Sequence, residues 1–116
     1  MLPTIFIVDD DNLFAQMLSD HLSKTNMYRI EVITKGSDCL KRLHEQPDVI
    51  ILDYHLESAT DEMNKDNGLV ILEKIKKANP KIHVVMLSGQ DHYGIAAQTI
   101  SKGAEQYVVK DQNAHV

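Results

Sequence analysis

The sequence predicts a single α/β domain built on a parallel β-sheet that helices cover on both faces. Short apolar runs bounded by turn residues alternate along the chain with stretches whose apolar residues recur at helical spacing. The run at residues 48–53 is nearly all apolar, as expected for a strand buried on both faces of a parallel sheet. Short crossovers between such strands imply right-handed strand–helix–strand units, and hence a doubly wound sheet.

Five strands and four helices are expected in strict alternation. The predicted strands cover residues 4–8, 29–33, 48–53, 82–87 and 107–109. The first helix is expected to bury one apolar stripe and to be capped by Asp10 or Asp11. That stripe consists of Leu13, Phe14, Met17, Leu18 and Leu22. The second helix is expected to begin at Gly36, the third to end at Asn79–Pro80 and the fourth to end at Gly103. The side chains of Cys39, Met17 and Met86 are expected to fill the core.

Composition excludes several classes of protein. The 116 residues carry 17 acidic and 12 basic side chains, and this net charge of −5 disfavours nucleic-acid binding. A single cysteine cannot form an intramolecular disulfide or a cysteine-ligated zinc site, and the six histidines show no metal-ligand spacing. The N-terminus does not resemble a signal peptide, and no apolar run approaches the roughly 20 residues of a membrane helix. We therefore expect a cytoplasmic protein without a membrane or nucleic-acid partner.

Polar residues stand where the strands end. Asp9 and Asp10 follow the first strand, Asp53 ends the third, Ser88 the fourth and Lys110 the fifth. Ligands of open α/β sheets bind beyond the carboxyl ends of the strands, so these side chains are expected to line one crevice. Mg²⁺ and the lysine ammonium are natural counter-charges for three converging carboxylates. Together with a hydroxyl, these groups are the parts of phosphoryl transfer to an aspartate.

Each of these residues has a simpler interpretation when taken alone. An aspartate after a strand is often a helix cap, which is the favoured interpretation for Asp11 and an equal alternative for the pair Asp9 and Asp10. Ser88 alone is typical of a turn, and Lys110 alone is typical of a solvated strand end. Their joint placement at four strand ends favours a common site.

The chain resembles the receiver domains of two-component response regulators over nearly its whole length. The segments that carry the resemblance are Ile7-Val8-Asp9-Asp10, Ile50-Ile51-Leu52-Asp53, Val84-Val85-Met86-Leu87-Ser88-Gly89, Lys102-Gly103-Ala104 and Tyr107-Val108-Val109-Lys110. The resemblance implies one receiver domain over residues 1–116, with a flavodoxin-like strand order 2-1-3-4-5. It also implies a fifth helix, for which the six residues after Lys110 are too few, so that helix is expected to be missing or truncated.

The resemblance assigns roles residue by residue. Asp53 is implied to be the phosphoacceptor and, with Asp10, a direct ligand of Mg²⁺ (or Mn²⁺), while Asp9 acts through a bound water. The backbone carbonyl of His55 completes the protein ligands, and Lys110 pairs with the acceptor and then with the phosphoryl group. Ser88 and Tyr107 are the implied switch pair. His55 and Gln90 are the positions implied to tune autodephosphorylation, and Gly89 keeps the pocket open.

The implied function is signalling in a phosphorelay rather than enzymatic turnover. A histidine kinase or a histidine phosphotransfer protein would supply the phosphoryl group, and the product is a change of conformation. One alternative is a degenerate receiver that serves only as a protein-interaction module. Another is a haloacid-dehalogenase-like phosphatase, which needs a second acid two residues after its nucleophile, where this chain has His55, and a cap domain.

The chain departs from the family pattern in three places. Residues 57–67 are predicted to be an inserted polar loop that is solvated, and they fit no calcium-loop register. The sharper hypothesis is that this loop selects the phosphodonor or partner. Asp111 follows Lys110 where the family commonly has a proline after a cis bond, so a trans bond is expected. Without a fifth helix, an exposed apolar patch would favour self-association, with a homodimer as the expected form.

Overall fold

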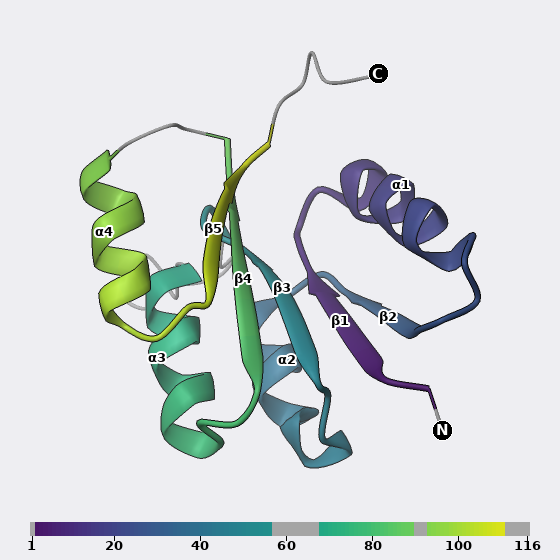
Figure 1. Ribbon diagram of the computed structural model, residues 1–116, viewed down its shortest axis with the longest axis horizontal. Helices are drawn as coiled ribbons and strands as arrows, with labels where there is room; N and C mark the ends of the chain where they lie inside the picture. Colours follow the sequence, from purple (N-terminus) through teal and green to yellow (C-terminus); the bar gives the residue numbers. More distant parts are fainter. Residues whose placement is uncertain (1, 57–67, 90–92, 111–116) are drawn as a thin grey trace.

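The computed structural model describes residues 2–56, 68–89 and 93–110 and has the predicted doubly wound architecture (Figure 1). Its strands are parallel and lie in the order β2-β1-β3-β4-β5. They are β1 (Thr4–Val8), β2 (Arg29–Ile33), β3 (Val49–Asp53), β4 (His83–Ser88) and β5 (Gln106–Val109). The predicted fold class and strand order are therefore confirmed, and the strand boundaries differ from the prediction by one residue at most.

The helices cover the two faces of the sheet unequally. They are α1 (Asn12–Ser23), α2 (Gly36–Lys41), the 3₁₀ turn η1 (Leu43–Glu45), α3 (Gly68–Ala78) and α4 (Tyr93–Ser101). In Figure 1, α1 lies on one face of the sheet, and α2, α3 and α4 lie on the other. Within the described part of the chain, no helix is long and apolar enough to cross a membrane.

The alternation of side chains along each strand divides the core into two clusters. In β1, Phe6 and Val8 belong to the larger cluster, where they meet α2 and α3, whereas Ile5 and Ile7 belong to the smaller cluster beneath α1. Successive strand residues point to opposite faces, so a run that is apolar throughout can be buried on both. The larger cluster includes Cys39, which is fully buried as predicted.

Local signals set the ends of the helices. The Asp11 side chain caps α1 by accepting a hydrogen bond from the Phe14 N–H at 3.1 Å, which confirms one of the two predicted caps. Gly103 follows α4 with a φ of +111°, a left-handed conformation that glycine adopts without strain.

The predicted apolar stripe of α1 is partly wrong. Leu13 and Met17 are exposed, at 73% and 62%, whereas Ala15 is buried and Leu18 packs against the smaller cluster. Because residues two positions apart lie about 200° apart around a helix, Leu13 and Met17 cannot share the face of Ala15. The sequence has apolar residues on both sides of α1, and only the packing shows which side meets the sheet.

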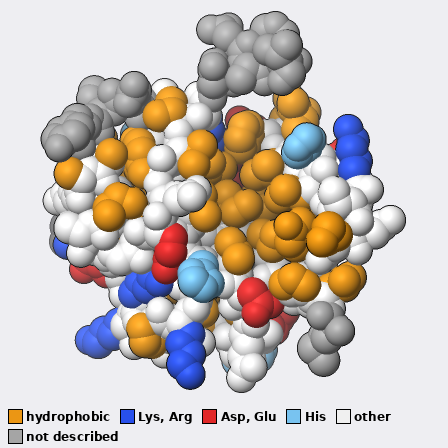
Figure 2. Space-filling view, in the orientation of Figure 1, with side chains coloured by type: hydrophobic (Ala, Val, Ile, Leu, Met, Phe, Trp, Pro, Cys, Tyr) orange, Lys and Arg blue, Asp and Glu red, His pale blue; other side chains and the backbone are white. Residues whose placement is uncertain are grey.

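The sheet face beside α1 remains partly open among the described residues. Val49, Ile51 and Val85 are half-buried, and Val108 is 40% exposed. All four stand at alternate strand positions, out of phase with the larger cluster. Figure 2 shows hydrophobic side chains gathered in the middle of this face. The predicted apolar patch is therefore present on the described surface.

Candidate functional site

Three carboxylates meet at the carboxyl ends of β1 and β3, the two central neighbours of the sheet. Asp9 is 1% exposed and Asp53 is 4% exposed, whereas Asp10 lies at the surface. One carboxylate oxygen of each residue lies within 4.8 Å of the others. The parallel register of β1 and β3, which pairs Val8 with Leu52, brings these residues together from positions 44 apart in the chain. The predicted convergence of the three aspartates is therefore present.

Lys110 supplies the positive charge of this cluster. Its Nζ lies 2.8 Å from Asp9 Oδ2 and 3.3 Å from Asp53 Oδ1. The backbone N–H of Lys110 donates to the carbonyl oxygen of Ser88 at 2.6 Å, which extends the β4–β5 pairing by one residue. The fully buried Ser88 thus stands beside Lys110 at the same edge of the sheet. Four strand ends contribute to the cluster, as the sequence predicted.

Backbone groups hold the two buried carboxylates in place. The Asp11 N–H donates to Asp9 Oδ1 at 2.9 Å, while the Asp9 N–H donates to the carbonyl of Ile33. Asp53 Oδ1 accepts a hydrogen bond from the His55 N–H at 3.3 Å. Each carboxylate therefore receives a backbone donor as well as the ammonium, and its direction is fixed by the turn that follows its strand.

Burial and charge shift the protonation equilibria of the site. Burial, together with the neighbouring charge of Asp9, raises the pKa of Asp53 to about 6, although Lys110 opposes this shift. For Lys110, burial lowers the pKa, but the hydrogen bond to Asp9 and the charges of Asp53 and Asp9 outweigh burial and raise it. One ammonium is thus shared between two buried carboxylates. The cluster still favours a further cation.

Gly68, the first residue of α3, lies directly against the backbone of Asp53. A β-carbon at position 68 would be 2.5 Å from the Asp53 carbonyl oxygen and 2.6 Å from the Tyr54 α-carbon. The Gly68 N–H donates to the Tyr54 carbonyl at 2.9 Å. The chain therefore returns from residues 57–67, which lie outside the described residues, to a fixed point beside Asp53.

The remaining predicted site residues fall into two groups. His55 is exposed and meets the Tyr54 ring edge-on at a centroid distance of 4.9 Å, and Tyr107 is half-buried against the larger core cluster. Gln90 and Asp111 lie outside the described residues, and so does the peptide bond that joins Lys110 to Asp111.

The position of Phe14 differs from the expectation based on the sequence. The sequence predicts Phe14 in the buried apolar stripe of α1, but the centroid of its ring lies 4.4 Å from Lys110 Nζ. The predicted cap at Asp11 is a sequence signal for this position of Phe14. A residue three positions after a helix cap lies in the first helical turn, close to the end of the strand that precedes the helix.

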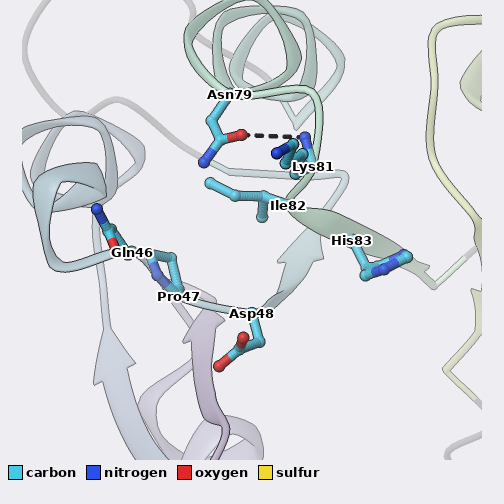
Figure 3. A pocket seen from close by; sticks show the side chains of 7 residues that line it. All are labelled: Gln46, Pro47, Asp48, Asn79, Lys81, Ile82 and His83. Carbon is cyan, nitrogen blue, oxygen red and sulfur yellow. Dashed lines mark hydrogen bonds between the residues drawn. The ribbon is translucent and has the colours of Figure 1, made fainter.

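A separate polar pocket opens at the opposite edge of the sheet (Figure 3). It lies where β3 and β4 begin, and its lining comprises Gln46, Pro47, Asp48, Asn79, Lys81, Ile82 and His83. Asn79 Oδ1 accepts a hydrogen bond from the Lys81 N–H at 3.0 Å. The three carboxylates of the candidate site lie at the carboxyl ends of the strands, away from this pocket.

Comparison with known protein families identifies the family of this chain. The family model of the response regulator receiver domain matches residues 5–116 of the chain. The chain belongs to this family. A curated relative, an NtrX-like response regulator of Rickettsia felis, is 32% identical to the receiver domain over 110 residues, which is 94% of this chain and 22% of the relative. The chemotaxis protein CheY of Listeria monocytogenes is 26% identical over 91% of this receiver domain and 84% of its own length.

Solved structures show the same fold. The receiver domain matches a BeF₃-activated DrrB receiver domain with a TM-score of 0.82 and 26% identity, covering 97% of this chain and 88% of that one. It also matches NtrX of Brucella abortus, solved in complex with ADP, with a TM-score of 0.81 and 26% identity over 95% of this chain and 24% of that one. The receiver domain spans about a fifth of the length of the NtrX-like relatives it matches.

Proposed function

We propose that this receiver domain accepts a phosphoryl group on Asp53 from a histidine kinase or a histidine phosphotransfer protein and signals through a change of conformation. The observation that carries the proposal is the placement of the Lys110 ammonium between Asp9 and Asp53, with Asp10 completing a cluster of three carboxylates. A site with one lysine ammonium and three acids is suited to receive an anionic group together with a second cation.

The acidic cluster fits a hard divalent cation. Its carboxylate oxygens already lie within 4.8 Å of one another, and such oxygens are the ligands that Mg²⁺ prefers. Asp9, Asp10, Asp53 and the backbone carbonyl of His55 would hold Mg²⁺ or Mn²⁺. When bound, the ion supplies positive charge that offsets the charge of the transferring phosphoryl group.

The side chains of the domain carry the transfer itself. An Asp53 carboxylate oxygen attacks phosphorus, and the bond from phosphorus to the imidazole nitrogen of the donor breaks as the new oxygen–phosphorus bond forms. The electron pair returns to the donor imidazole. Lys110 keeps its contact with the acceptor and pairs with a phosphoryl oxygen, and the Ser88 hydroxyl donates a hydrogen bond to the same group.

The same residues link the transfer to a signal. Movement of Ser88 toward the phosphoryl group opens space behind it, and the Tyr107 ring, half-buried on the core, turns inward to fill that space. His55 and Gln90 set the lifetime of the phosphorylated state, and residues 57–67 select the donor or partner. In this proposal residues 1–116 act as one cytoplasmic signalling domain that assists its own phosphorylation and dephosphorylation but is not an enzyme.

The decisive experiment is intact mass spectrometry after incubation with acetyl phosphate and Mg²⁺. We expect a single phosphoryl adduct that requires both the metal and Asp53, so Asp53→Asn and a chelator each abolish it. An adduct that persists in Asp53→Asn would contradict the assignment of the acceptor. No adduct on the wild-type protein, with metal binding confirmed, would favour a protein-interaction module instead.

A further inference from the structure

The ring of Phe14 faces the ammonium of Lys110. Its centroid lies 4.4 Å from Nζ, within the roughly 6 Å over which an aromatic face attracts a cation. Phe14 is half-buried, yet it belongs to neither of the two apolar clusters that the described residues form. Its ring contributes to the candidate site rather than to the core.

A continuous series of contacts connects this ring to Asp9 and Lys110. The Phe14 N–H donates to Asp11 Oδ1 at 3.1 Å, and the Asp11 N–H donates to Asp9 Oδ1 at 2.9 Å. Lys110 Nζ then donates to the other oxygen of Asp9 at 2.8 Å, and its ammonium lies over the ring. The position of the ring is therefore coupled to the position of Asp9 through short, local hydrogen bonds.

An aromatic ring suits this position for an electrostatic reason. The Lys110 side chain is 14% exposed and faces two carboxylates on one side. A third acid on the other side would draw the ammonium away from Asp53, and an aliphatic side chain would offer it no attraction. The negative face of a ring attracts the ammonium without a full charge and excludes water from it.

We propose that Phe14 is a positioning residue of the phosphoacceptor site, and that its ring holds the Lys110 ammonium beside Asp53. This inference rests on the proposed function and adds to it the residue that directs the lysine. Phe14 makes no contact with the phosphoryl group in this scheme and acts through Lys110.

The first test compares phosphorylation rates, measured by intact mass with acetyl phosphate and Mg²⁺. Phe14→Leu keeps an apolar side chain but removes the ring, and we expect phosphorylation to slow about threefold to tenfold. Phe14→Tyr keeps the ring and is expected to restore the wild-type rate. Leu13→Ala, at an exposed position of the same helix turn, is the matched control and should leave the rate unchanged. An unchanged rate in Phe14→Leu, or no rescue by Phe14→Tyr, would overturn the proposal.

The second test reads the contact directly, without phosphorylation. Ring current should shift the Lys110 ε-methylene protons upfield in NMR spectra of the wild type and of Phe14→Tyr, but not of Phe14→Leu. Lys110→Met identifies the signal. Absence of a Phe14-dependent shift would refute the contact. A wild-type protein that shows the shift but takes no phosphoryl group would contradict the proposed function, and the ring–ammonium contact itself would stand.

Discussion

Gly68 approaches Asp53 so closely that a β-carbon at position 68 would lie 2.5 Å from the Asp53 carbonyl oxygen. The obstructing atoms belong to the backbone of the turn at Asp53 and Tyr54, which cannot move aside as the end of a flexible side chain can. The same turn receives the Gly68 N–H at the Tyr54 carbonyl. The start of α3 and this turn are therefore packed as one unit.

Gly68→Ala is expected to destabilise the fold and to disturb the backbone at Asp53. The added methyl must displace either α3 or the Asp53–Tyr54 backbone, at a cost of about 1–3 kcal/mol in the free energy of unfolding. Urea denaturation measures the loss. Gly94→Ala, at a helical glycine where a β-carbon meets no atom within 4 Å, is the matched control and should not destabilise the fold. Equal stability of the two variants would contradict the close approach.

Asp53→Asn is expected to stabilise the metal-free protein at pH 7. Burial and Asp9 raise the pKa of Asp53 to about 6, so the folded state binds a proton there more tightly than the unfolded chain does. Above that pKa the ionised carboxylate lowers the free energy of unfolding. Its replacement by the neutral amide of asparagine should raise that free energy by on the order of 1–2 kcal/mol.

Thermal unfolding at two pH values, with and without Mg²⁺, checks this prediction. The gain from Asp53→Asn should shrink as the pH falls below about 6, because the wild-type carboxyl group then carries its own proton. Added Mg²⁺ should raise the melting temperature of the wild type more than that of the variant. A variant less stable than the wild type at pH 7 would show that the contact between Lys110 and Asp53 outweighs burial.

Glu105 joins β5 to α3 at the amino end of the sheet and gives a pH-dependent contribution to stability. Its carboxylate lies 2.9 Å from Lys76 Nζ and accepts the Val84 N–H at 2.6 Å, and His83 Nδ1 lies 3.4 Å away. Burial raises the pKa of Glu105, but the hydrogen bonds from Lys76 and Val84 outweigh burial and lower it.

Glu105→Gln should therefore lower the free energy of unfolding at pH 6 by up to about 1 kcal/mol. Because the folded pKa is depressed, the contribution is present above the unfolded value of about 4.5 and is lost as the pH falls through the folded pKa. The difference between wild type and variant, measured by urea denaturation, should shrink between pH 6 and pH 3. A difference that grows in acid would contradict the ion pair.

The open sheet face is expected to drive self-association at high concentration. Val108 is 40% exposed and lies opposite Leu87 in the register, on the same face of the sheet as the half-buried Val85 and Ile51. Val108→Gln should lower the fraction of dimer in sedimentation velocity experiments, because it interrupts the patch. Val109→Gln changes the adjacent residue of β5, which points to the opposite face, and should leave the dimer fraction unchanged. A wild-type protein that remains monomeric at millimolar concentration would contradict this prediction.

The sequence predicted those features that depend on strand order and on the chain's own periodicity. Asp9, Asp53, Ser88 and Lys110 could be placed at one edge because parallel strands end there together. Phe14 and Met17 could not be separated, since both lie on the apolar surface of α1 and only the rotation of that helix against the sheet assigns one to Lys110 and the other to solvent. The approach of Gly68 to Asp53 likewise depends on how α3 packs, which local pattern does not specify.

Asp9, Asp53 and Lys110 follow strands whose backbones should open to solvent with different ease. Asp9 and Asp53 follow β1 and β3, each of which is paired with a strand on both sides, so their backbone amides should exchange with solvent only when the whole sheet opens. Lys110 follows β5, a four-residue strand at the edge of the sheet, where fraying is local. The two acids thus follow strands in the interior of the sheet, and Lys110 follows the strand whose backbone should open most readily.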